Sequence, residues 1–294
     1  MQFKIAFILS VMFAASPVVF GQVTGRTVEY RDGDTVLEGY IAYDDAVTGP
    51  RPAVMVVPEW QGLNDYAKGR ADQLAALGYA GFAIDMYGKG VRPDTHQAAA
   101  KISGIYFKDR ALMRQRAKAA YDYLLQQAQV DSSKVAAIGY CFGGAAVLEM
   151  ARAGWPLAGV AAFHGFLDTP MPAHPGDIKA PIRIFQGDED SFTFPGLEGF
   201  RKEMHEAQAL DWQVIILSGA VHRFTDPQAG NDKGKGMAYN KTADEESWNA
   251  LKLFLNEVFN GRKEGQVIGA IGVSGSSVEN DHAAALAVTQ PAAG

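Results

Sequence analysis

Cys141 is the only cysteine in this chain of 294 residues, and it stands in a G-x-C-x-G pattern between Gly139 and Gly143. An apolar run typical of a strand precedes the pattern, and an Ala-rich run typical of a helix follows it. Small flanking residues let a strand and a helix approach closely at a sharp turn that carries a nucleophile. The partial positive charge of a helix N-terminus favours the thiolate, the reactive form of cysteine. The pattern therefore predicts a nucleophilic cysteine, with a thiol that is merely packed in the core as the alternative.

A thiol nucleophile needs a base that takes its proton, and the base needs an acceptor that orients it. The candidate bases are His222 and its rival His164, and the candidate acceptors are Asp188 and Asp190. Chain order favours His222 over His164, because nucleophile, acid and histidine then follow one another as in a large class of enzymes with such triads. His164 is then expected to lie in the substrate pocket.

Short apolar runs, mostly of β-branched or aromatic residues, are typical of strands buried on both faces of a sheet, and they occur at 53–57, 81–84, 135–138, 160–163, 182–185 and 214–217. Apolar residues recur at helical spacing over 117–128, and further helices are expected near 65–77, 144–153, 196–209 and 242–259. The alternation predicts an α/β fold whose mainly parallel sheet has helices on both faces. An alternating stretch around a Gly-Asp turn, 27–43, predicts an antiparallel hairpin at the N-terminal edge.

The chemistry-bearing residues follow these runs. Glu59, Cys141, Asp190 and His222 each stand directly after a predicted strand. In mainly parallel sheets the active groups collect at the carboxyl ends of the strands. We therefore expect the four side chains to meet at one edge of the sheet.

The composition limits the classes of partner. The chain carries 27 Lys and Arg against 33 Asp and Glu, a formal net charge of −6. Because it has no run rich in Lys and Arg, neither nucleic acid nor an anionic lipid surface is expected as a partner. A lone cysteine cannot form an internal disulfide, so the fold must depend on its hydrophobic core, which a hydrophobic content of 48% allows.

Residues 1–21 have the composition of a signal peptide, with a lysine before an apolar core at 5–13 and a glycine at the end. The core is too short for a membrane span, so we expect cleavage, no stable membrane insertion, and a mature chain in the periplasm or outside the cell. Residues 27–260 contain no linker and are expected to form one domain. The tail 263–294, rich in Gly, Ala and Ser without periodicity, is expected to be disordered.

Together these motifs resemble the dienelactone hydrolase family of the α/β-hydrolase superfamily. The resemblance covers residues 27–260 and is carried by PEWQG at 58–62, DMYG at 85–88, GYCFGG at 139–144, GDED at 187–190 and HRF at 222–224. It implies a Cys-His-Asp triad that hydrolyses carboxylic esters or lactones through an acyl-cysteine intermediate, without a metal or an organic cofactor. The acid of this fold stands three residues after the glycine of its turn, which selects Asp190 over Asp188.

The resemblance also implies roles for neighbouring groups. The backbone N–H groups of Phe142 and Trp60 would form the oxyanion hole, where fixed donors stabilise the developing negative charge. Glu59 would contact the resting thiol and control when it ionises. The alternative for Glu59 is an ordinary solvated carboxylate in a loop.

The expected substrate differs from that of the family's namesake. Family members that act on dienelactone hold its carboxylate with two arginines, whereas this chain has Lys89 at the first position and Asp226 near the second. Lysine lacks the planar two-pronged grip of arginine, and aspartate repels a carboxylate. We therefore expect a neutral small-molecule ester or lactone. The residues expected around it are Tyr87, Lys89, His164 and Arg223, with Trp60, Tyr87 and Phe142 as the aromatic residues of the pocket.

Two other classes of protein share some of these features. A noncatalytic ligand-binding protein could use the same fold, because a fold does not imply a function. A thiol redox protein is disfavoured, since the chain has neither a second cysteine nor a C-x-x-C motif. The Gly- and Lys-rich stretch 226–239 is expected either to cap the site or simply to be exposed, and the protein is expected to act as a monomer.

Overall fold

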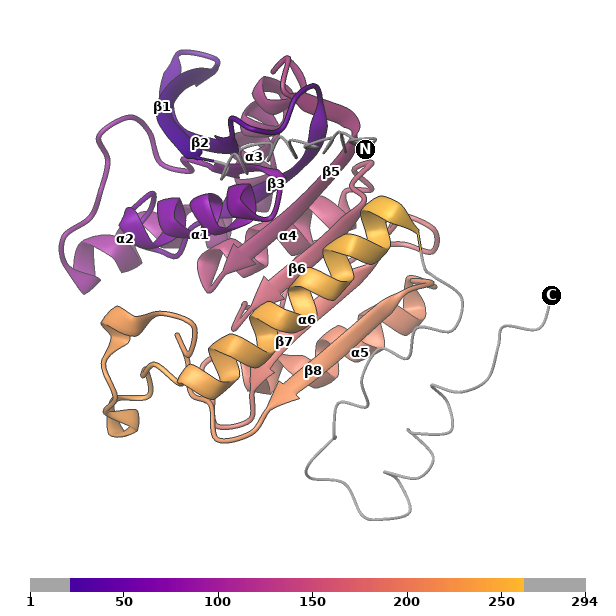
Figure 1. Ribbon diagram of the computed structural model, residues 1–294. Helices are drawn as coiled ribbons and strands as arrows, with labels where there is room; N and C mark the ends of the chain where they lie inside the picture. The colour runs from indigo at the N-terminus through magenta and orange to yellow at the C-terminus, as the bar shows by residue number, and fades with distance from the viewer. Residues whose placement is uncertain (1–21, 262–294) are drawn as a thin grey trace, which may run out of the picture.

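The computed structural model describes residues 22–261, which form one eight-stranded sheet in the order β1-β2-β4-β3-β5-β6-β7-β8 with helices on both faces (Figure 1). At one edge, β1 (Val23–Asp32) and β2 (Thr35–Asp44) pair antiparallel around Gly33, whose φ of 56° suits a tight turn. β2 then pairs antiparallel with β4 (Ala80–Ala83). The hairpin predicted at 27–43 is confirmed.

From β4 to β8 all the neighbouring strands are parallel. Every residue of β4, β6 and β7 is buried, which explains why the apolar runs of β4 and β6 are continuous instead of alternating. In β7 the buried polar residues Arg183 and Gln186 interrupt the run. The predicted runs coincide with the strands to within a few residues. The remaining strands are β3 (Arg51–Val57), β5 (Val130–Tyr140), β6 (Gly159–Phe163), β7 (Ile182–Gly187) and β8 (Trp212–Leu217).

The helices predicted from apolar periodicity are present as α1 (Asp65–Ala76), α3 (Arg110–Leu125), α4 (Phe142–Arg152), α5 (Leu197–Glu206) and α6 (Lys241–Asn260). One helix, α2 (His96–Lys108), was not predicted. Its buried residues Ala99, Ser103 and Tyr106 recur at helical spacing, but a polar residue interrupts the apolar stripe. Within residues 22–261, no helix combines the length and the apolar character that crossing a membrane requires.

Two hydrophobic cores lie on opposite faces of the sheet. In β3, Val54 and Val56 belong to one core and Met55 to the other, as the alternation of side chains along a strand dictates. α1 and α6 contribute to the core that contains Val54, whereas α3, α4 and α5 contribute to the core that contains Met55. Figure 1 shows α1 and α6 together in front of the sheet.

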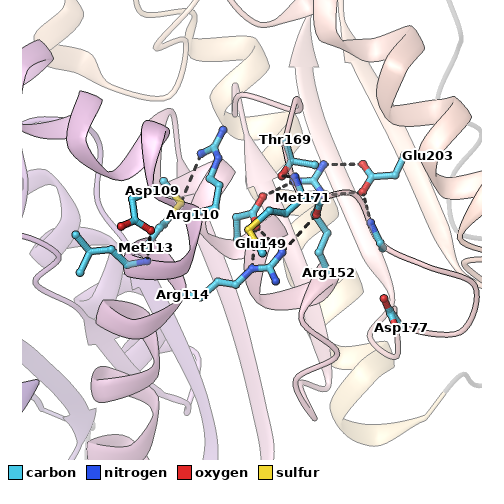
Figure 2. A network of polar contacts seen from close by, with 12 residues as sticks. Asp109, Arg110, Met113, Arg114, Glu149, Arg152, Thr169, Met171, Asp177 and Glu203 are labelled. Atoms are coloured by element: carbon cyan, nitrogen blue, oxygen red, sulfur yellow. Dashed lines mark hydrogen bonds and ion pairs between the residues drawn. The ribbon is translucent and has the colours of Figure 1, made fainter.

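A buried ionic network joins the helices on the second face (Figure 2). Glu149 of α4 accepts hydrogen bonds from Nε of Arg114 on α3, at 2.9 Å, and from Arg152, at 3.1 Å. Arg152 also donates to both carboxylate oxygens of Glu203 on α5, at 2.8 and 2.7 Å. The network links α3 and α5 to α4, the helix that begins next to Cys141.

Candidate active site

The chain turns sharply at Cys141, between the end of β5 and the start of α4. Its backbone has φ 53° and ψ −112°, an uncommon conformation for a residue with a side chain. A Cβ on Gly139 would lie 2.0 Å from the carbonyl oxygen of Gly143, and a Cβ on Gly143 would lie 2.1 Å from that of Val57. The strand-to-helix turn expected from the sequence is therefore present, and its flanking positions accept only glycine.

His222 and Asp190 form a buried hydrogen-bonded pair. Nδ1 of His222 donates to Oδ2 of Asp190 at 2.8 Å. The carboxylate also accepts from the backbone N–H groups of Phe192 and Thr193, at 3.0 and 3.2 Å, and from the Thr193 hydroxyl at 2.6 Å. Burial alone would raise the pKa of Asp190, but the hydrogen bonds from His222 and Thr193 hold it below its ordinary value. Asp190 is therefore a fixed, ionised acceptor that orients the ring.

The imidazole of His222 also interacts with the sulfur of Cys141. Burial alone would lower the pKa of His222, but the charge on Cys141, together with hydrogen bonds to Asp190 and Cys141, raises it to about 10. Both residues are nearly buried and line one cavity of about 370 Å³. Cys141, His222 and Asp190, which come from three different strand ends, are thus brought together in the expected order of contact.

Glu59 lies near this group but has a different partner from the one expected. Its side chain is fully buried, and Oε2 lies 2.9 Å from Nε of Arg223, although neither carboxylate oxygen makes a well-aligned hydrogen bond. Arg223, which has a φ of 59°, also pairs with Asp226. Burial raises the pKa of Glu59, against the opposing effect of Arg223. Glu59 is therefore not a solvated loop carboxylate, and Arg223 is held away from the cavity wall by two acids.

Trp60 and Phe142, whose N–H groups were expected to form the oxyanion hole, both line the cavity. Phe142 is the first residue of α4, so its N–H has no partner within the helix. The hydroxyl of Tyr87 donates to the carbonyl oxygen of Trp60 at 2.9 Å, which fixes the peptide that follows Trp60. Tyr87 itself is buried behind these residues and does not line the cavity, so its expected pocket position is corrected to a supporting one.

Two residues expected around the substrate lie elsewhere. His164 is fully buried, and its Nε2 lies 3.0 Å from the hydroxyl of Thr225. Burial holds the pKa of His164 well below its usual value, and its ring packs against the ring of His222 from behind, with 5.0 Å between centroids. Lys89 is half-exposed and pairs with Glu29 on β1. Neither side chain lines the cavity that contains Cys141 and His222.

Most of the cavity wall was missed by the sequence reasoning. Phe192 lines it, although it was not expected to, and so does Phe166. The remaining missed residues belong to the unpredicted helix α2 and to the loop after His222, namely Ala100, Ser103, Gly104, Phe107 and Met237. Two signals could have found the helical set, namely the helical spacing of Ala99, Ser103 and Tyr106 and the Thr95 N-cap, whose side chain accepts from the N–H of Ala98.

The loop at 226–239 borders the site. The N–H of Ala238 donates to the carbonyl oxygen of His222 at 3.1 Å, and the neighbouring Met237 lines the cavity. The two alternatives expected for this loop were a cap on the site and simple exposure. Its contacts at Met237 and Ala238 place it at the border of the site. Among residues 22–261, no group of three or more His, Cys, Asp or Glu side chains is placed to hold a metal ion.

Comparisons with known proteins identify the family. The model of the dienelactone hydrolase family matches residues 37–259. A curated relative from Bradyrhizobium sp., named "Probable 2-oxo-3-(5-oxofuran-2-ylidene)propanoate lactonase", is 30% identical over 242 residues, which cover 78% of this chain and 93% of the relative.

Solved structures agree with this assignment. The dienelactone hydrolase-like promiscuous phosphotriesterase P91 from metagenomic libraries is 42% identical, with a TM-score of 0.74, over 80% of this chain and 98% of P91. The structure called m3DLH is 36% identical, with a TM-score of 0.76, over 81% of this chain and 99% of its own length. The chain described here belongs to the dienelactone hydrolase family and is a hydrolase of carboxylic esters or lactones.

Proposed function

We propose that this protein hydrolyses neutral carboxylic esters or lactones through an acyl intermediate on Cys141. One observation carries the proposal: Cys141 and His222 line the same apolar cavity, and His222 is held by Asp190 at 2.8 Å. A nucleophile, a base in contact with it and an acceptor that orients the base are the components of a catalytic triad.

The mechanism has two steps of acyl transfer. The Cys141 thiolate attacks the carbonyl carbon, and the N–H groups of Phe142 and Trp60 stabilise the oxyanion, each contributing about 3 kcal/mol. The tetrahedral intermediate collapses, the carbon–oxygen bond to the leaving group breaks, and the alkoxide takes a proton from His222. Water, deprotonated by His222, then attacks the thioester and releases the acid, and the thiolate–imidazolium pair is restored.

The charges around the cavity favour a neutral substrate. Among the described residues that line it, His222 is the only titratable side chain besides Cys141. Arg223, the nearest arginine along the chain, is already paired with Glu59 and Asp226. A substrate carboxylate would therefore enter an apolar space in which no Lys or Arg side chain compensates its charge.

We assign Glu59 to control of the thiol, acting through Arg223. Arg223 interacts electrostatically with both Glu59 and Cys141, so the state of Glu59 changes the positive charge that the sulfur experiences. In the Glu59→Gln variant the rate of Cys141 alkylation and the ester turnover should both change. If neither changed, Glu59 would have no such role.

We also propose that the protein is exported. The proposal rests on the signal-like composition of residues 1–21, which lie outside the described part of the chain. N-terminal sequencing of the protein recovered from a periplasmic or culture fraction checks this. An intact N-terminus in a protein confined to the cytoplasm would contradict export.

The test of catalysis uses p-nitrophenyl acetate and iodoacetamide. We expect turnover by the wild-type protein, its loss in step with alkylation of Cys141, and at least a 1,000-fold lower rate in Cys141→Ala at unchanged melting temperature. The Asp188→Asn variant, altered in the same turn as Asp190, is the matched control and should keep its activity. Ester binding without turnover would favour a noncatalytic binding protein, and rapid reduction of a disulfide substrate would favour a redox protein.

A further inference from the structure

One face of α2 forms a wall of the catalytic cavity. Ala100, Ser103, Gly104 and Phe107 line the same space as Cys141. Positions spaced by three, four and seven residues lie on one face of a helix. Three of these four side chains are very small, so the cavity is wide at the point where α2 passes it.

Gly104 is not required by the backbone. It lies inside α2, and a Cβ added to it would meet no atom within 4 Å. Gly139 and Gly143 are different, because a Cβ on either would clash with a carbonyl group. Glycine is unfavourable in a helix interior relative to alanine. What it contributes here is open volume beside the catalytic sulfur.

Aromatic and apolar side chains make up most of the cavity wall. The aromatic residues are Trp60, Phe107, Phe142, Phe166 and Phe192. The hydroxyl of Ser103 donates to the carbonyl oxygen of Ala100 at 3.4 Å, so it presents little free polarity to the cavity. Aromatic walls bind flat apolar rings through edge and stacked contacts.

We propose that Gly104 is a specificity-determining residue, which leaves room in the cavity for a neutral ring of about phenyl size on the substrate. The ring can belong to the acyl group or to the alcohol, and the chemistry of its recognition is the same in both cases. This inference rests on the proposed function, because the cavity is the one that contains the nucleophile. A larger side chain at position 104 fills the space of the ring without disturbing Cys141 or His222.

The experiment compares ring-bearing and small esters by release of acid in a pH-stat. The kcat/KM values of methyl benzoate and of phenyl acetate are each divided by that of methyl acetate, in the wild type and in Gly104→Leu. We expect at least one of the two ratios to fall about tenfold or more in the variant, a size of effect usual for shape discrimination in an apolar pocket. A fall only for methyl benzoate assigns the ring to the acyl side, and a fall only for phenyl acetate assigns it to the alcohol.

Gly69→Leu is the matched control. Gly69 lies inside α1, and its Cβ position is also open, but it does not line the cavity. Both ratios should therefore stay at their wild-type values in Gly69→Leu. Two unchanged ratios in a folded Gly104→Leu protein would overturn the proposal.

A binding measurement separates this inference from the proposed function. Acetophenone, a neutral aromatic ketone, is titrated against the tryptophan fluorescence of the protein, since Trp60 lines the cavity. We expect at least tenfold weaker binding by Gly104→Leu than by Gly69→Leu. If acetophenone bound to the wild type and bound at least tenfold more weakly to Gly104→Leu, but no ester was hydrolysed, the proposed function would fail. The role of Gly104 in making room for a ring would still be supported. Equal affinities of Gly104→Leu and Gly69→Leu for acetophenone would contradict the role of Gly104 in ring binding, whatever the hydrolysis results.

Discussion

Burial alone would lower the pKa of His222, but the charge on Cys141 and the hydrogen bonds to Asp190 and Cys141 raise it to about 10. Asp190 accepts a hydrogen bond from Nδ1 at 2.8 Å and so stabilises the protonated ring. His222 is therefore suited to hold the proton that the leaving group needs.

The pKa of His222 should fall when the carboxylate of Asp190 is neutralised. In Asp190→Asn, the loss of the negative charge and of the charged acceptor removes part of what raises the pKa to about 10. An NMR titration of the His222 ring protons measures the change, with Asp188→Asn as the control. The same midpoint in wild type and in Asp190→Asn would contradict the argument.

Linkage gives the matching effect on stability. Folding raises the pKa of His222 from about 6.5, so the protonated ring stabilises the fold fully below that pH, and the contribution is lost as the pH rises through about 10. The unfolding free energy of the wild type should therefore decline more steeply between pH 7 and pH 10 than that of Asp190→Asn.

At the scale of elements, the turn between β5 and α4 depends on close backbone contact. A Cβ on Gly139 would lie 2.0 Å from the carbonyl oxygen of Gly143, so Gly139→Ala must displace α4 or the strand. We expect a loss of about 3 kcal/mol in the free energy of unfolding, together with a loss of turnover. Urea unfolding measures the loss in the free energy of unfolding. Gly69→Ala, in an open position of α1, should instead stabilise the protein by about 1 kcal/mol, and equal effects of the two changes would contradict the close-contact argument.

The elements also show where sequence reasoning succeeds and where it stops. The runs at 160–163 and 182–185 predict β6 and β7 well, because strands buried on both faces are mostly apolar. Arg183 is the exception within these runs, and it pairs with Asp211. The helical pattern of α2 is weaker to read, because Ser103 interrupts the buried face and Gly104, a poor helix former, lines the cavity. These small residues, which weaken the pattern, are also the ones that leave the cavity open.

On the scale of the whole molecule, the ionic network around Glu149 holds three helices together (Figure 2). Glu149→Ala would leave Arg114 and Arg152 without their shared carboxylate in a buried region. We expect the unfolding free energy to fall by about 3 to 5 kcal/mol, as is usual when one partner of a buried ion pair is removed.

Urea unfolding is again the measurement. The control is Asp122→Ala, which removes a half-exposed pair with Lys118 on α3 and should change the stability by less than about 0.5 kcal/mol. Equal losses in the two variants would show that the network contributes no more than a surface pair.

The α/β architecture, the edge hairpin and the segments that bear Cys141, Asp190 and His222 can be predicted from the amino-acid sequence alone. These depend on local patterns, namely apolar periodicity, glycine at a sharp turn and the placement of polar residues after strands. Long-range packing pairs Glu59 with Arg223, leaves Lys89 and His164 outside the cavity, and makes α2 part of the cavity wall. The direction of a side chain and the partner that it contacts depend on segments far away along the chain. No local sequence pattern indicates which distant segment will pack against a given side chain.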